Sequence, residues 1–212
     1  MFRTADNARF WDRIARKYAS DPISDMGGYE RTLERVRHYL RPGDRVLEFG
    51  CGTGTTALKL APSVESLLAT DISSEMIAIA REKAHSEGIG NVTFEVAAPE
   101  SADWPAESFD AVLGFNVLHL LEDSGRALGN IRHALKPGGL LLTKTPCLKD
   151  MNPVFRVVVP LMQMVGKAPH VDFLSAAEVD KLLKRAGFEV IECAYHASNG
   201  RDARPFIVGH RL

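Results

Sequence analysis

Residues 46–54 have the sequence VLEFGCGTG, in which an apolar run that contains one acid is followed by three glycines at alternate positions. Val46, Leu47 and Phe49 favour a buried parallel strand. The glycines predict a tight turn into a helix, because glycine allows unusual backbone dihedrals and leaves space for a ligand beside the backbone. Dinucleotide sites, phosphate loops and plain turns all use such glycines, so the rest of the chain must distinguish between them.

The size and composition of the chain limit its class. Its 212 residues predict one domain with a substantial core. The 26 Lys and Arg nearly balance the 27 Asp and Glu, without a basic cluster, so nucleic acid is not expected as a partner. Three dispersed cysteines without a CxxC pair disfavour a disulfide framework and a zinc site, and favour the cytoplasm. We expect no export signal and no stable membrane insertion, since no uncharged apolar run reaches about 18 residues.

The chain after residue 41 alternates short apolar strands with amphipathic helices. We expect strands at residues 46–49, 66–70, 92–96, 109–115 and 140–145, and helices at residues 55–61, 73–88 and 123–135. This alternation predicts an α/β fold, with a parallel sheet covered by helices on both faces. Two late strands, at residues 188–195 and 206–210, are expected to form a hairpin at the sheet edge, joined through Asn199 and Gly200.

We therefore expect a single domain over residues 1–212. Residues 1–40 would form a helical cap, and residues 41–145 the ligand-binding core. Residues 146–174 form a variable apolar segment, and residues 175–212 supply a last helix, which opens with a capping box, and the hairpin.

Two apolar segments each have two interpretations. In the helix expected at residues 6–19, one face carries Phe10, Ile14 and Tyr18, with Trp11 and Ala15 beside it. This face either packs on the domain or caps a ligand. Residues 151–165 predict a short helix kinked by prolines. That helix either packs in the core or in a homodimer contact, or it covers the substrate as a lid.

Three polar residues stand near strand ends. Glu48 lies two residues before Gly50, Asp71 closes the second strand, and Asn116 closes the fourth. An acid at the end of the second strand suits a ribose, because a carboxylate accepts hydrogen bonds from both hydroxyls. Thr55 stands where a dinucleotide fingerprint has its third glycine, and Glu48 would repel phosphate but attract a cation. These residues indicate an adenosine ligand with a positive charge.

At this point the sequence resembles the class I S-adenosylmethionine-dependent methyltransferases, and within them the small-molecule and lipid-quinone branch. The likeness covers roughly residues 8–145. The matching motifs are VLEFGCGTG, LLATDIS, FDAVLGFNVLHLLED and LKPGGLLL, and FWDRIARKY is similar to an N-terminal helix of that branch. The resemblance implies a Rossmann-like, seven-stranded, mostly parallel sheet with a C-terminal antiparallel hairpin and an N-terminal helical cap.

The resemblance also implies where S-adenosylmethionine binds and S-adenosylhomocysteine forms. Glu48, Gly50, Gly52 and Asn116 would lie near the methionyl moiety, Tyr18 would reach its carboxylate, Asp71 would hold the ribose, and Ile72 and Met76 would flank adenine. One position departs from the family pattern. Ala98 stands where many members carry an acid for adenine N6, so backbone groups at Ala97 and Ala98, or Glu100, would take that contact.

Methyl transfer from this cofactor to an acceptor would be an in-line displacement that requires no metal. A hydroxyl acceptor benefits from a general base, and His119 is the first candidate, with His170 second; the alternative is that His119 packs in the loop. The apolar residues 146–174 favour a small, partly hydrophobic acceptor, methylated at nitrogen, oxygen or carbon. Two other functions stay open: an NAD-dependent oxidoreductase, and a non-catalytic cofactor-binding or partner-binding module.

Overall fold

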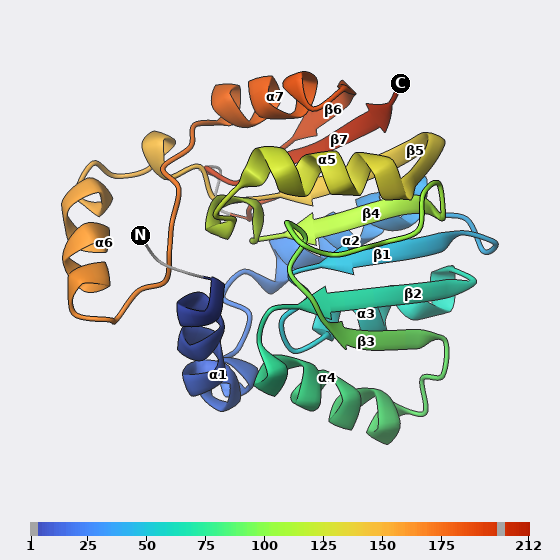
Figure 1. Ribbon diagram of the computed structural model, residues 1–212, viewed down its shortest axis with the longest axis horizontal. Helices are drawn as coiled ribbons and strands as arrows, with labels where there is room; N and C mark the ends of the chain where they lie inside the picture. Colours follow the sequence, from blue (N-terminus) through green and yellow to red (C-terminus); the bar gives the residue numbers. More distant parts are fainter. Residues whose placement is uncertain (1–3, 199–201) are drawn as a thin grey trace.

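The structure, a computed structural model, describes residues 4–198 and 202–212 and places seven strands of this part of the chain in one sheet (Figure 1). The strands are β1 (Arg45–Phe49), β2 (Ser66–Asp71), β3 (Val92–Val96), β4 (Phe109–Phe115), β5 (Leu135–Lys144), β6 (Phe188–Ala194) and β7 (Phe206–Arg211). Their order is β3-β2-β1-β4-β5-β7-β6. The first five strands pair in parallel, and β7 runs antiparallel to both β5 and β6. The expected fold class is confirmed.

Helices cover both faces of this sheet. They are α1 (Thr4–Ser20), α2 (Met26–Tyr39), α3 (Thr55–Leu60), α4 (Ser74–Glu87), α5 (Ser124–Ala134), α6 (Phe155–Met164) and α7 (Ala176–Arg185). Short 3-10 turns span Ala61–Ser63, Leu118–Leu120 and Leu148–Asp150. Apolar residues of α2, α3 and α4 pack with Val46 in one core layer, while those of α5 and α7 pack with Leu47 and Phe49 in the other. Because side chains alternate along a strand, β1 contributes to both layers.

Two details near the end of the sheet differ from expectation. Strand β5 begins at Leu135, where residues 136–139 were expected to end a helix and stay outside the strand. The register shifts between the pairs Phe109–Leu135 and Ala111–Leu140, and such an irregularity accommodates Pro137 within a strand. The predicted hairpin forms, but of its two strands only β6 is at an edge of the sheet, and β7 lies inside. Asn199 and Gly200, the expected connection, lie outside the described residues.

Helix α1 packs through a different face from the one predicted. Its packed side comprises the buried Asn7 and Ala15 and the partly buried Trp11 and Ala19, of which Trp11, Ala15 and Ala19 pack with Met76 and Ile79 of α4. These positions are four residues apart, so they share one side of the helix. Tyr18, which was expected on the packed face, is 50% exposed.

A carboxylate fixes the angle at which α1 meets α4. Asp12 Oδ1 accepts hydrogen bonds from Ser73 Oγ at 2.6 Å and from the backbone N–H of Glu75 at 3.1 Å. An acid at a helix N-terminus satisfies free backbone donors and interacts favourably with the helix dipole. The first helix is therefore attached to the loop that follows β2.

Helix α6 lies apart from both core layers, at the left of Figure 1. Within the described part of the chain none of its residues is buried, so the prediction that this segment packs in the core is wrong. Its helical form is confirmed, with Pro160 inside the helix. None of the helices in the described residues is long and apolar enough to cross a membrane.

Candidate functional site

The glycine turn after β1 requires glycine for two reasons. Gly50, Gly52 and Gly54 have φ values of 65°, 54° and 74°, which L side chains rarely adopt. A Cβ at Gly50 would lie 2.3 Å from Val117 Cγ2, and one at Gly54 would lie 2.8 Å from Ala80 Cβ. A Cβ at Gly52 would meet only the ring of Tyr18, at 3.8 Å. The outer two glycines thus permit close packing, while the middle one leaves open space.

Asp71 joins the end of β2 to this turn. Its Oδ2 accepts a hydrogen bond from the backbone N–H of Gly52, and its Oδ1 accepts one from the backbone N–H of Ser73, both at 2.9 Å. Burial raises the pKa of Asp71, although these backbone donors favour its charged form. The carboxylate is held in one orientation beside the glycine turn.

Glu48 is a buried acid without a hydrogen-bond partner for one of its oxygens. The residue is 2% exposed, and no described residue donates to Oε2. Burial, and secondarily the charge of Asp71, raises its pKa to about 8. An unpaired buried carboxyl is costly unless a ligand satisfies it. The site is therefore suited to a cationic ligand group.

Asn116 ends β4 in a strained conformation. Its φ is 55°, which is uncommon outside glycine but tolerated by asparagine. The backbone N–H of Asn116 donates to the carbonyl of Lys144 at 2.7 Å, which holds this conformation at the end of β5. Strained residues of this kind often stand at functional sites.

Two connected cavities lie above the carboxyl ends of β1, β2 and β4. The smaller measures about 100 Å³ and the larger about 530 Å³. Both are lined by Tyr18, Gly50, Gly52, Phe115 and Asn116. The order of strands reverses between β1 and β4, where ligands of open α/β sheets bind.

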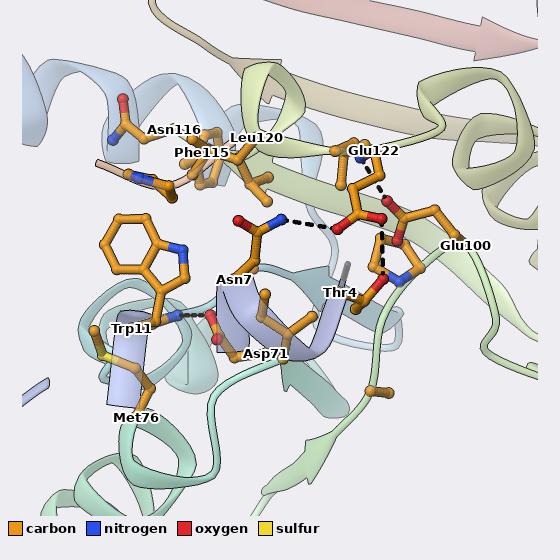
Figure 2. A pocket seen from close by; sticks show the side chains of 18 of the residues that line it. Thr4, Asn7, Trp11, Asp71, Met76, Glu100, Phe115, Asn116, Leu120 and Glu122 are labelled. Carbon is orange, nitrogen blue, oxygen red and sulfur yellow. Dashed lines mark hydrogen bonds between the residues drawn. The ribbon is translucent and has the colours of Figure 1, made fainter. Parts of the chain in front are cut away.

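The smaller cavity extends towards β2 and β3 under helix α1 (Figure 2). Among its lining residues are Asp71, Ile72, Met76, Ala97 and Glu100, with Thr4, Asn7 and Trp11 from α1 and Glu122 after β4. Asn7 Nδ2 donates to Glu122 Oε1 at 2.9 Å, and Asn7 Oδ1 accepts from the backbone N–H of His170 at 2.9 Å. These bonds tie α1 across the opening. Sequence reasoning missed Asn7, which lies outside the motifs, and Glu122, which lies near the end of the fourth-strand motif but was given no role.

The structure brings most of the predicted cofactor residues together. Tyr18, Gly50, Gly52, Asp71, Ile72, Met76 and Asn116 line the smaller cavity, and Glu48 lines the larger one. Ala98 lines neither cavity in the described structure, while its neighbours Ala97, Pro99 and Glu100 do. The contact with adenine is therefore expected from these neighbours and not from Ala98.

The candidate bases do not reach the cavities. His119 is buried and absent from the described lining residues; its Nδ1 lies 2.9 Å from Thr145 Oγ1, and burial lowers its pKa to about 4. His170 Nε2 lies 3.2 Å from Asp172 Oδ1, and Pro169 lines the cavity in its place. The structure thus favours the packing interpretation of His119 over its role as a general base.

The larger cavity contains further polar residues, to which the sequence analysis gave no ligand-binding role. They are Thr53, Thr55 and Thr56 after the glycine turn, Tyr29 and Thr32 of α2, Lys144 at the end of β5 and Arg204 before β7. Lys144 is the last residue of the fifth strand, and this position at the carboxyl end of a parallel strand was the only feature of the sequence that pointed to the site. Arg204 is brought in by the antiparallel return of β7.

The strand order, the glycine turn and the polar residues that end β2 and β4 define the class I methyltransferase fold. Residues 13–193 match the family described as methyltransferase domains, and the chain belongs to this family. The expected class of S-adenosylmethionine-dependent methyltransferases is confirmed over the NAD-dependent oxidoreductases.

Relatives agree with this assignment. The ubiquinone/menaquinone biosynthesis C-methyltransferase UbiE of Vibrio vulnificus is 33% identical over 162 residues, which are 72% of this chain and 60% of UbiE. The highly reducing polyketide synthase pspA of Penicillium soppii is 31% identical over 84% of this chain, which corresponds to 8% of pspA. The chain therefore spans less than two thirds of both proteins.

A solved structure confirms the fold. An S-adenosylmethionine-dependent methyltransferase of Thermotoga maritima, described as a possible histamine N-methyltransferase, superposes with a TM-score of 0.73 at 23% identity. The match covers 96% of this chain and 99% of the other.

Proposed function

We propose that the protein transfers a methyl group from S-adenosylmethionine to a small, partly apolar acceptor. The observation that carries this proposal is the buried, unpaired carboxyl of Glu48 beside the junction of the two cavities. A cofactor that carries a sulfonium and an ammonium group provides a cationic partner for this carboxyl. Family membership supports the cofactor, and the domain would comprise residues 1–212 with residues 1–40 as its cap.

The residues present fit such a cofactor. Asp71 retains free lone pairs for ribose hydroxyls after its two backbone contacts, and Ile72 and Met76 provide an apolar surface beside it for adenine. Gly50 and Gly52, with Glu48 and Asn116, would hold the methionyl end, and Tyr18 would reach its carboxylate.

When bound, the cofactor supplies a methyl group that is already activated on sulfur. The remaining task of the chain is to position the acceptor atom about 3 to 3.5 Å from that methyl group, in line with the bond that breaks. A volume of about 530 Å³ lies in the range of small-molecule sites, roughly 300–1,000 Å³. Ile23, Leu33 and Phe115 give this cavity apolar walls. Quinone precursors are the first acceptors to test, given the likeness to UbiE.

We propose that α6 packs against a second copy of the chain. Exposed apolar residues dominate this helix and its ends: Val154, Phe155, Val157, Val158, Leu161, Met162, Met164 and Val165. A patch of this kind on a soluble domain is typical of an interaction surface. The three free thiols support a cytoplasmic location.

Calorimetry tests the cofactor first. S-adenosylhomocysteine should bind the wild-type protein, and NADH should not. Radiolabelled S-adenosylmethionine with a panel of amines, phenols and quinone precursors then tests transfer. Binding of NADH alone would contradict the proposal, and cofactor binding without transfer to any acceptor would favour a non-catalytic module.

A further inference from the structure

Two cations line the larger cavity, on the other side of β4 from Glu48. Lys144 closes β5, and Arg204 precedes β7. Lys144 Nζ lies 3.2 Å from Thr32 Oγ1 and 3.5 Å from Asp202 Oδ2, while Arg204 Nε lies 3.4 Å from Asp202 Oδ1. The two cations thus share a single carboxylate, whose side chain is 3% exposed.

This carboxylate does not neutralise both cations. Charged N–H···O bonds are normally about 2.7–2.9 Å long, so both contacts to Asp202 are loose. In residues 4–198 and 202–212, the terminal nitrogens of Arg204 have no hydrogen-bond acceptor. Asp21 and Asp25 also line the cavity, and the charge of Asp25 acts on Lys144. The oxygens of Asp25 accept hydrogen bonds from the backbone N–H of Gly28 and from Ser198, and none from Lys144 or Arg204 in the described residues. The terminal nitrogens of Arg204 are therefore donors that a ligand in this cavity can use.

The ammonium group of Lys144 is accessible from the cavity but partly desolvated. Its side chain is 13% exposed, against 40% for Arg204, and burial lowers the pKa of Lys144. A partly buried cation with a loose partner gains from a bound anion. Thr32 of α2 orients the lysine: its Oγ1 accepts the hydrogen bond from Lys144 Nζ while its hydroxyl donates to the carbonyl of Gly28 at 2.8 Å. The same oxygen lies 3.0 Å from His196 Nδ1.

The two ends of the cavity have opposite character. Strands β1 and β5 lie on either side of β4, so Glu48 and Lys144 are separated by two strand spacings, about 10 Å, across the sheet, and Lys144 lies two residues further along. Phe115 of β4 and Leu33 of α2 contribute apolar side chains to the same lining. One end is suited to the cationic part of the cofactor, and the other to a negative charge on a second ligand.

We propose that Lys144 and Arg204 bind an anionic group of the methyl acceptor, a carboxylate or a phosphate, whose apolar body lies against Leu33 and Phe115. This inference rests on the proposed function and names the acceptor class: an amphiphilic molecule with one acidic group. The main competing occupant is the carboxylate of the cofactor itself, so the test keeps the cofactor site filled.

Benzoate and phenyl phosphate serve as probes, with benzamide as the neutral counterpart of benzoate. Each is titrated into the protein saturated with S-adenosylhomocysteine and followed by ligand-observed NMR. The variants are Lys144→Met and Arg204→Met. Lys59→Met is the matched control, because Lys59 pairs with Glu30 and lines neither cavity in the described structure. Thermal unfolding and S-adenosylhomocysteine affinity show whether each variant is folded.

We expect at least one anion to bind, and its affinity to fall about tenfold or more in Lys144→Met and Arg204→Met, but not in Lys59→Met. Benzamide should bind equally to all four proteins, and the stronger anion distinguishes carboxylate from phosphate. Three results would overturn the proposal: no anion binding to the wild type, equal binding to the variants, or displacement of S-adenosylhomocysteine by the anion. If S-adenosylhomocysteine itself fails to bind, the proposed function is wrong, and the same titrations without it still decide the role of the two cations.

Discussion

The carboxylate of Asp71 accepts a hydrogen bond from the backbone N–H of Gly52 at 2.9 Å, which joins the end of β2 to the turn after β1. A second bond, from the backbone N–H of Ser73, holds the other oxygen. One side chain therefore shapes the glycine turn and also faces the smaller cavity. Its removal should affect the ligand both directly and through the turn.

We expect Asp71→Ala to weaken S-adenosylhomocysteine binding by about 1.5–3 kcal/mol, as for the loss of hydrogen bonds to a charged group. Asp71→Asn should have a smaller effect, because its amide oxygen can still accept one of the backbone bonds. Calorimetry measures both affinities, with Asp180→Asn as a control that removes an exposed acid of α7. Wild-type affinity in Asp71→Ala would exclude its role in cofactor binding.

The buried carboxyl of Glu48 makes stability depend on pH. Its pKa is about 8 in the folded protein, against an ordinary value of 4.5. Between these values the unfolded chain has lost the proton and the folded one retains it, so Glu48 lowers the free energy of unfolding as pH rises. The effect is bounded by about 1.4 kcal/mol per pKa unit. Asp71, whose pKa is also raised, contributes in the same direction.

Urea denaturation between pH 5 and 8 measures this fall in the free energy of unfolding. The fall should be smaller in Glu48→Gln than in the wild type. Calorimetry at pH 7 in buffers of different ionisation enthalpy should also show that S-adenosylmethionine releases a proton from the wild type, and less from Glu48→Gln. The same pH dependence of stability in both proteins would show that Glu48 ionises normally.

His119→Gln should leave turnover within a few-fold of the wild type, because the imidazole lies outside both cavities and its Nδ1 faces Thr145. Stability should instead change with pH. The pKa of His119 falls from 6.5 to about 4 on folding, so below pH 6.5 the unfolded chain takes up the proton first and the folded state loses stability. Chemical denaturation at pH 5 and 7.5 should show a smaller pH effect in His119→Gln. A loss of turnover by a factor of 100 or more, with the fold intact, would restore its role as a base.

Replacement of Val157 and Leu161 by Asp should change assembly and leave cofactor affinity unaltered. Both side chains are exposed on α6, and neither lines a cavity in the described structure. Sedimentation velocity should show a dimer for the wild type and a monomer for the double variant. Arg156→Ala, which removes a polar residue of the same helix, is the control. A wild-type monomer at all concentrations would contradict the dimer.

Residues 45–145 show how far sequence alone can reach. The periodicity of the strands, the glycines at 50, 52 and 54 and the acid at Asp71 are local signals, because strand burial, turn dihedrals and strand ends are decided within a few residues. Parallel strands bring their carboxyl ends to one edge, so Gly52, Asp71 and Asn116 could be placed together before any coordinates. The capping box of α7, Ser175 with Glu178, was local in the same sense.

Contacts between distant segments required the tertiary structure. The packed face of α1 is set by α4 and by Asp12, which binds the N-terminus of α4. Hydrophobic periodicity placed Trp11 and Ala15 beside the packed face, although they belong to it. The role of His119 likewise required the tertiary structure, because its hydrogen-bond partner Thr145 lies 26 residues away in the sequence.

Sequence by itself determined the class of fold, because strand periodicity, the glycine turn and strand direction depend on short-range order. The cofactor followed from the resemblance of the sequence motifs to a known family. Only the tertiary structure decided what surrounds the acceptor. Lys144, Thr32 and Arg204 meet because β7 returns antiparallel beside β5 and α2 packs across their ends. Burial, pairing and charge at that meeting point are properties of the packed chain, and no short stretch of residues encodes them.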